Sequence, residues 1–197
     1  MGLFTYTDAE IIRTFELWYT GKMRITIIGA SGSGKSTLAR QISEAFNIPR
    51  VEIDRIWFKY DGHKYLNGSI EQKEVIMNKI TTEIQDFLSK NNSWVIDGSY
   101  SKIQPIIAEK TDAVVFIKRP LLKRVIGHVL RVMRAQDRHP EVTKTQDLMF
   151  VKTIIKRWGK GEDKKLENLS RQYSEKLVVL KNFGEIDSYF NSLITSK

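Results

Sequence analysis

MRITIIGASGSGKSTL, residues 23 to 38, is the stretch that decides the fold of this chain. Its apolar, β-branched run Ile25–Ile28 predicts a buried strand. From Ser36 to Phe46 the apolar residues Leu38, Ile42, Ala45 and Phe46 recur at helical spacing. The stretch therefore predicts a strand, a glycine-rich turn and a helix in direct succession.

The turn between them matches the phosphate-binding pattern G-x-x-x-x-G-K-[S/T] in full. It consists of Gly29, Ala30, Ser31, Gly32, Ser33, Gly34, Lys35 and Ser36, followed by Thr37. Glycines let the backbone wrap a phosphate so that its N–H groups form an anion nest, and the helix N-terminus adds its dipole. Lys35 can then reach the β- and γ-phosphates, while the Ser36 hydroxyl can ligate Mg²⁺. We expect the chain to bind ATP with Mg²⁺, because a chance glycine-serine turn does not account for both flanks.

Composition limits the class of protein. The 197 residues are 41% hydrophobic, which suits one buried domain, and the absence of cysteine excludes disulfides and thiolate zinc sites. No apolar run has the length of a membrane span, and Asp8, Glu10 and Arg13 interrupt the N-terminal apolar residues. We expect a cytoplasmic protein without membrane partners, a monomer or homodimer.

The formal net charge of +9 raises a nucleic-acid hypothesis. An enzyme that handles two phosphorylated ligands also needs positive charge. The lysines of the second half are scattered through amphipathic segments, so a solvated helix face accounts for most of them. Nucleic acid is therefore an alternative partner, and it is not the favoured one.

Residues 1–22 precede the first predicted strand. Thr7 and Glu10 form a candidate capping box, and Gly21 would end that helix. We expect an N-terminal extension or docking helix there, with no chemistry of its own, and a single domain over residues 23–197.

The run Val51–Ile56 (VEIDRI) predicts a second strand, parallel to the first and beside it. Ligands gather at the carboxyl ends of such strands, which places Glu52, Asp54 and Trp57 near the phosphates. Asp54 could hold a Mg²⁺-bound water or orient a substrate hydroxyl. A helix N-cap or an ordinary ion pair is the alternative.

The rest of the sheet follows at regular spacing. A polar, aromatic flap is expected at about 57–70, then a helix over Ile70–Leu88. Trp94–Ile96 begins a third strand, which ends in Asp97, Gly98 and Tyr100, and Ala113–Ile117 and Leu177–Leu180 are the fourth and fifth. Five strands alternating with helices predict a doubly wound parallel sheet.

The most basic helical region lies between the fourth and fifth strands. Arg124, His128 and Arg131 recur at helical spacing and share one face, and Arg134 and Arg138 continue beyond it. A lid is expected at about 131–160. Aligned guanidinium groups can clamp phosphates, although an ordinary solvated face is the alternative.

Four segments together resemble a known family. RITIIGASGSGKSTLARQI, IPRVEIDRIWF, WVIDGSY and VVFIKRPLLKRVIGHVLR resemble the topology modulation proteins, nucleotide-kinase-like relatives of adenylate and shikimate kinases. The resemblance runs from Met23 to about the final strand. It implies an α/β, three-layer P-loop NTPase fold of the nucleoside monophosphate kinase type, with a five-stranded parallel sheet and a short helical lid.

The resemblance also implies roles for single residues. Asp54 falls at a substrate-binding carboxylate, Glu52 at a magnesium-associated acid, and Asp97-Gly98 at the D-G of adenylate kinases. Arg124 matches an arginine that lies against adenine. His128 stands where those kinases have a phosphate-contacting arginine, which leaves Arg131 or Arg134 for that contact.

The expected function is a small phosphotransferase that moves the γ-phosphate of MgATP to a nucleotide or another small acceptor. Lys35, Asp54 and Arg131 are the candidate catalytic residues, and Arg134 and Arg138 the further lid contacts. The acceptor pocket is expected from Asp54, Trp57, Asp97, Gly98 and Tyr100, and the metal site from Ser36 and Glu52. A nucleic-acid-associated ATPase or regulator of DNA topology, or purely structural ATP binding, are the alternatives.

Overall fold

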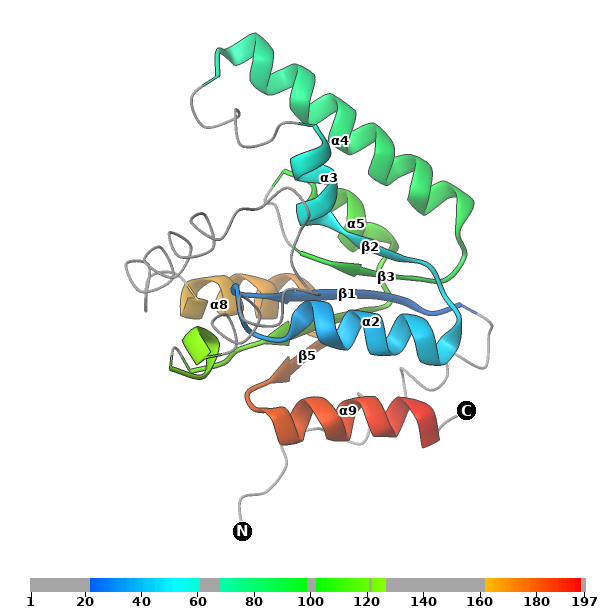
Figure 1. The fold of residues 1–197 in the computed structure, drawn as a ribbon, viewed down its shortest axis with the longest axis vertical. Helices are drawn as coiled ribbons and strands as arrows, with labels where there is room; N and C mark the ends of the chain where they lie inside the picture. The colour runs from blue at the N-terminus through cyan, green and yellow to red at the C-terminus, as the bar shows by residue number, and fades with distance from the viewer. Residues whose placement is uncertain (1–21, 61–67, 99–101, 121, 127–161, 196–197) are drawn as a thin grey trace.

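The computed structural model describes residues 22–60, 68–98, 102–120, 122–126 and 162–195 (Figure 1). Its strands are β1 (Arg24–Gly29), β2 (Arg50–Glu52), β3 (Trp94–Asp97), β4 (Ala113–Ile117) and β5 (Leu177–Leu180). Its helices are α2 (Lys35–Phe46), α3 (Ile53–Lys59), α4 (Ile70–Lys90), α5 (Gln104–Lys110), α8 (Glu162–Tyr173) and α9 (Phe183–Thr195).

The five strands form one parallel sheet in the order β2-β3-β1-β4-β5. The register pairs Ile27 of β1 with Asp97 of β3, and Gly29 with Ile117 of β4. The predicted doubly wound sheet is confirmed. From β1 the chain continues to β2 on one side, and from β3 it crosses to β4 on the other. Sheets with such a reversal bind ligands at the carboxyl ends of the strands beside it, which here are β1 and β3.

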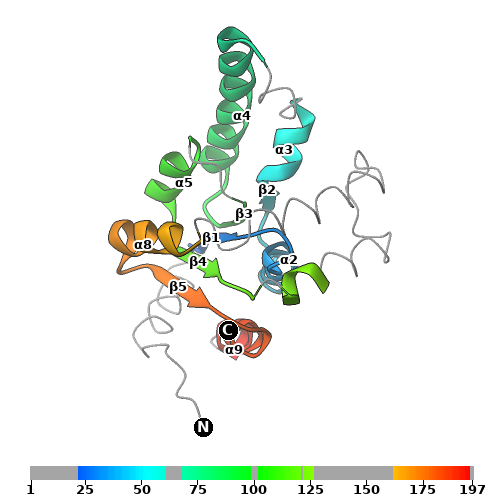
Figure 2. The same cartoon turned by 90° about the vertical axis from the view of Figure 1, so that its left-hand side faces the viewer.

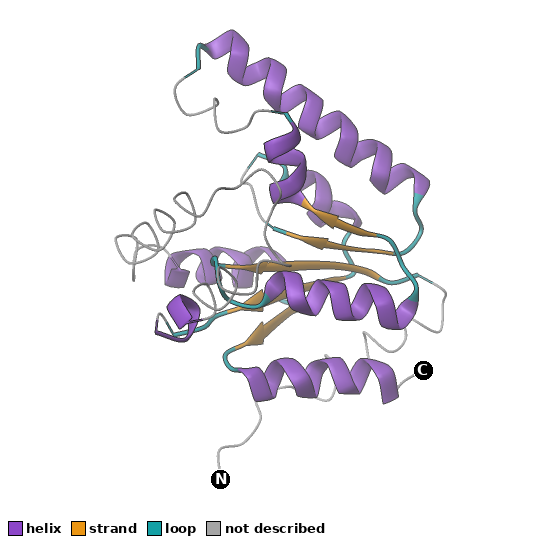
Figure 3. Cartoon of the chain, viewed as in Figure 1, coloured by secondary structure: helices purple, strands orange, loops and turns teal. Residues whose placement is uncertain are grey.

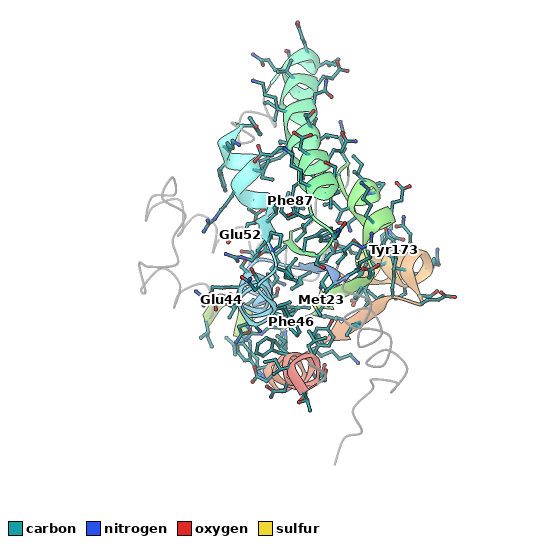
Figure 4. The ribbon with its side chains drawn as sticks, turned by 90° about the vertical axis from the view of Figure 1, so that its right-hand side faces the viewer. Met23, Glu44, Phe46, Glu52, Phe87 and Tyr173 are labelled. Atoms are coloured by element: carbon teal, nitrogen blue, oxygen red, sulfur yellow. The ribbon has the colours of Figure 1, made fainter. Side chains whose placement is uncertain are left out.

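Helices cover both faces of the sheet, which gives three layers (Figures 2 and 3). Consecutive residues of β1 point to opposite faces: Ile27 packs in the core with α2 and α9, while Ile28 packs with α8. Helices α3, α4 and α5 share a further core with Trp94 and Ile96 of β3. The continuous apolar runs of the strands follow from this coverage. Figure 4 shows Met23 close to Phe46 of α2, which packs against the same core.

The second predicted strand is wrong beyond Glu52. Only Arg50–Glu52 is extended, and Ile53–Lys59 is helix α3, with Asp54 in its first turn. The sequence VEIDRI fits both periods, because Val51 and Ile53 alternate as in a strand while Ile53 and Ile56 share a helix face. Burial of both isoleucines against α4 and α5 decides for the helix.

The predicted neighbour of β1 is also wrong. β3, not β2, pairs with β1, and β2 pairs only with β3. The carboxylate at the end of the strand beside the phosphate loop is therefore Asp97. Asp54 approaches the same loop from α3.

Several predicted features lie outside the described residues or at their margins. The extension 1–21, flap residues 61–67 and lid residues 131–160 are among them. Of the flap, Trp57–Lys59 belong to α3, and Ser69 caps α4 with a reciprocal capping box to Gln72. No helix in the described ranges is both long and apolar enough to cross a bilayer.

Candidate functional site

The loop Gly29–Ser36 joins β1 to α2 as a tight anion nest. Gly32 and Gly34 have φ angles of 75° and 101°, in the left-handed region that favours glycine. The Ser33 N–H donates to the Ala30 carbonyl at 3.2 Å and closes the turn. Gly34 is the N-cap of α2 and provides no side-chain cap, and the first turn of α2 holds no acidic residue. The N–H groups at this helix start are therefore suited to an anion.

The short helical turn 122–126 supports the loop from outside. Arg124 is 7% exposed, and its Nε donates to the Ser31 carbonyl at 3.1 Å. A Cβ on Gly32 would lie 2.5 Å from the Arg124 carbonyl oxygen. Gly32 is thus required by close approach as well as by φ. A solvated surface role is excluded for Arg124 by its burial.

Lys35 and Asp54 meet in front of the loop. Lys35 Nζ lies 4.0 Å from Asp54 Oδ2, and the two side chains are 12% and 40% exposed. Asp54 comes from the first turn of α3 and so remains partly open to solvent. The pair joins the residue expected to bind the transferred phosphate to the carboxylate expected to orient the acceptor.

Asp97 is the buried acid of the site, with 1% of its surface exposed. Burial raises the pKa of Asp97 to about 6, and the negative charges of Glu52 and Asp54 act in the same direction. The nearby Lys35 charge and a hydrogen bond with Ser36 lower it. Asp97 Oδ2 has no hydrogen-bond partner within the described chain, and the Nη1 atom of Arg50 is 4.0 Å away.

Arg50 links three elements of the site and was missed in the sequence. Its Nη1 donates to the Ser36 carbonyl at 3.2 Å, and its Nη2 lies 2.7 Å from Glu52 Oε1. Arg55 Nε pairs with the other Glu52 oxygen at 3.2 Å. Figure 4 labels Glu52 below α3. Only the folding of β2 beside β3 brings Arg50 to the loop, so no local pattern could have indicated it.

The residues present fit a magnesium ion bound together with phosphate. Mg²⁺ in kinase sites takes one or two carboxylates, and its remaining ligands are waters and substrate phosphates. Ser36 supplies a hydroxyl, and the neighbouring Asp97 supplies a carboxylate whose Oδ2 is buried without a hydrogen-bond partner in the described chain. Within the described ranges, no group of three or more His, Cys, Asp or Glu side chains is arranged to hold a metal alone. Glu52, the predicted metal acid, is engaged by Arg50 and Arg55, which favours Asp97.

Some of the other predicted site residues lie in the described part of the chain, and the rest lie outside it. Gly98 has a φ of 112° and its Cβ position is 3.1 Å from Ile53 Cβ, so it allows β3 to pack against α3. Trp57 is half-buried and packs on the core of α3 and α4. Thr37 is exposed. The remaining candidates lie outside the described residues: Tyr100, His128, Arg131, Arg134 and Arg138.

Arg119 is a second residue that the sequence did not single out. It lies two residues beyond the end of β4, is 5% exposed, and its Nη1 lies 3.4 Å from the carbonyl oxygens of both Gly32 and Ser33. An arginine after an apolar strand carries no specific signal, so its contact with the loop depends on β4 lying beside β1.

The chain is similar in sequence to an adenylate kinase. Over 80 residues it is 34% identical to the adenylate kinase of Wigglesworthia glossinidia brevipalpis, a stretch of 39% of this chain and 38% of that protein. The chain thus matches well under half of that kinase's length. No family model matches the chain.

Solved structures of small-molecule kinases share the fold. A shikimate kinase from Bacteroides thetaiotaomicron aligns with 87% of this chain and 96% of its own, at a TM-score of 0.50 and 14% identity. A gluconokinase from Sinorhizobium meliloti 1021 aligns with 88% of this chain and 90% of its own, at a TM-score of 0.50 and 15% identity. This chain has the P-loop kinase fold.

Proposed function

We propose that this protein is a MgATP-dependent phosphotransferase acting on a nucleotide or another small acceptor. One observation carries the proposal: Lys35 Nζ of the phosphate loop lies 4.0 Å from Asp54 Oδ2 of α3. A donor-binding cation and a partly open carboxylate thus meet at one point. The small-molecule kinases that share the fold, and the partial similarity to an adenylate kinase, support this class of reaction.

The donor side is the loop Gly29–Ser36. Its backbone N–H groups and the start of α2 would hold the phosphates, and Lys35 would lie against the β- and γ-phosphates. As the phosphoryl group transfers, negative charge shifts to the leaving ADP oxygen. Lys35 would stabilise that charge in the transition state.

The acceptor side is organised by Asp54. An acceptor hydroxyl that donates to Asp54 is oriented for in-line attack on the γ-phosphorus. The new bond forms between the acceptor oxygen and phosphorus, the bond from phosphorus to the β–γ bridging oxygen breaks, and the hydroxyl proton passes to Asp54. If the acceptor is a phosphate, no proton passes to Asp54, and Asp54 would orient the acceptor only through a hydroxyl or amine elsewhere on it.

Magnesium would be held by Ser36 and Asp97 together with the phosphates, and when bound it supplies charge neutralisation at the transferring group. Arg50 would keep Ser36 and Glu52 in place. Arg131, Arg134 and Arg138 remain candidates for further phosphate contacts from the lid.

The acceptor could be a nucleotide, as the partial similarity to an adenylate kinase suggests, or a hydroxylated metabolite. Membership of the topology modulation proteins would be in accord with either. The alternative of a nucleic-acid-associated ATPase depends on the net charge of +9. Arg50, Arg119 and Arg124 instead direct their guanidinium groups to the site. We favour the phosphotransferase.

ADP formation across a panel of nucleoside monophosphates, nucleosides and hydroxylated metabolites tests the proposal. At least one acceptor should raise ADP formation well above the rate with ATP alone. Lys35→Ala should lower kcat by about a hundredfold or more, since it removes transition-state stabilisation. Lys22→Ala, an exposed lysine before the amino end of β1, is the control and should leave kcat unchanged. Near-parent turnover of Lys35→Ala would refute the role of the loop in transfer.

A further inference from the structure

We propose that Arg119 is a positioning residue for the polyphosphate, acting through the peptide groups of Gly32 and Ser33 without touching the phosphates. The inference rests on the proposed function, because it takes the loop as the phosphate site. It assigns a task to a buried cation that in-line transfer does not otherwise use.

The sheet brings Arg119 to the back of the loop. Ile117, the last residue of β4, pairs with Gly29, the last residue of β1. Two residues later, Arg119 Nη1 lies 3.4 Å from the carbonyl oxygens of Gly32 and of Ser33. The same atom is 4.0 Å from the Cβ position of Gly34. One guanidinium therefore contacts two consecutive peptide groups of the nest.

Contact with those carbonyls sets the direction of the N–H groups at the other ends of the peptides. In a trans peptide the C=O and N–H point in opposite directions. The Ser33 N–H closes the turn to Ala30 at 3.2 Å. The Gly34 N–H belongs to the same peptide group as the Ser33 carbonyl, so it points away from Arg119 Nη1 and would donate to a phosphate held by the loop. A cation at the carbonyl end also polarises the peptide and strengthens the N–H as a donor.

Within the described residues, no carboxylate neutralises the positive charge of Arg119. The guanidinium lies 3.7 Å over the ring of Phe183, which is 55% exposed and shields it from water. Arg119 Nε is buried without a hydrogen-bond partner, and no ion pair joins Arg119 to a carboxylate in the part of the chain that the structure describes. Burial lowers the pKa of Arg119, yet an arginine remains protonated at neutral pH. A buried cation of this kind favours an anion at the loop.

A purely structural role is the competing explanation. Stacking on Phe183 could simply fasten the start of α9 to the loop. That role predicts a lower melting temperature for Arg119 variants with unchanged phosphate affinity. Phosphate affinity and stability must therefore be measured separately.

Binding of a non-hydrolysable ATP analogue and of inorganic tripolyphosphate, each with Mg²⁺, can be measured by calorimetry beside thermal unfolding. Arg119→Gln should weaken both ligands about tenfold, the size expected when a charge-assisted contact is lost. Equal loss for both ligands is expected because the effect lies at the phosphates and not at the base. Lys118→Gln is the matched control, since it removes the neighbouring positive charge, which pairs with Asp163 at 2.5 Å. It should change either affinity less than about twofold.

Parent-like tripolyphosphate affinity in Arg119→Gln overturns the inference, whether or not nucleotide affinity falls, and so does equal loss in Lys118→Gln. Arg119→Lys keeps the charge and lacks the fork that reaches two carbonyls, so it should lose about threefold. Parent-like affinity in that variant also overturns the inference, even if Arg119→Gln does not fold. If the unmodified protein binds neither ligand, the proposed function itself fails. If it binds both and only Lys35→Ala abolishes binding, the inference about Arg119 fails alone.

Discussion

Asp97→Asn should make the ligand-free protein more stable at neutral pH while it removes activity. Asp97 is 1% exposed, and burial raises its pKa to about 6 from a usual value of 3.8. The folded protein therefore holds a proton that the unfolded chain has released between about pH 4 and pH 6. The free energy of unfolding falls as the pH rises through this window, because ionising the buried carboxyl is unfavourable.

The size of the effect follows from the two pKa values. A difference of about two pKa units corresponds to about 3 kcal/mol once both states are ionised. Part of that loss is already present at pH 4.5, so about 2 kcal/mol should appear between pH 4.5 and pH 8. Asn keeps the size of the side chain and cannot ionise. The stability advantage of Asp97→Asn over the parent should therefore grow by about 2 kcal/mol across that interval.

Urea unfolding at pH 4.5, 6 and 8, followed by tryptophan fluorescence with EDTA and without nucleotide, measures this difference. Trp94 lies in the same strand as Asp97, is fully buried and reports the transition. Comparing the variant with the parent at each pH cancels the contribution of the other titrating groups to the free energy of unfolding. A pH-independent difference would refute the reasoning. An advantage that shrinks as pH rises would show that Lys35 and Arg50 lower the pKa of Asp97 more than burial raises it.

Three further predictions concern the loop and its carboxylates. Gly32→Ala should destabilise the protein by about 2 kcal/mol or more in thermal unfolding and weaken ATP-analogue binding, since the left-handed φ and the Arg124 carbonyl both oppose a Cβ; a parent-like melting temperature would contradict this. Asp54→Asn should leave ATP-analogue affinity within about threefold and lower transfer to a hydroxyl acceptor by about a hundred- to ten-thousand-fold; a loss confined to Mg²⁺–nucleotide affinity would move Asp54 to the metal site. Arg50→Gln should raise the Mg²⁺ concentration needed for half-maximal activity. Arg55→Gln, which removes an arginine that is 64% exposed, should not. Equal effects of the two variants would show that Arg50 acts only through the ion pair with Glu52 that Arg55 also makes.

Local sequence determined the parts of the fold that depend on neighbouring residues. The loop Gly29–Ser36 follows from a contiguous motif, and β4 and β5 were predicted with the bounds observed, because each is a continuous apolar run between turns. The helix Ile70–Lys90 followed from its apolar period and differs from the prediction only at its last turn. Lys35 and Ser36 could be predicted as site residues for the same reason, since their positions are set by the loop itself.

Tertiary structure decided which elements meet. The segment VEIDRI satisfies a strand and a helix equally, and burial of Ile53 and Ile56 against α4 and α5 made it a helix from Ile53 onward. Strand order is likewise absent from any local pattern, because it depends on which apolar faces are covered together. The placement of β3 beside β1 buries Asp97 next to Ser36 and raises its pKa. Arg50 and Arg119 reach the loop for a related reason: the sheet brings one residue from β2 and another from just beyond the end of β4 to the same nest.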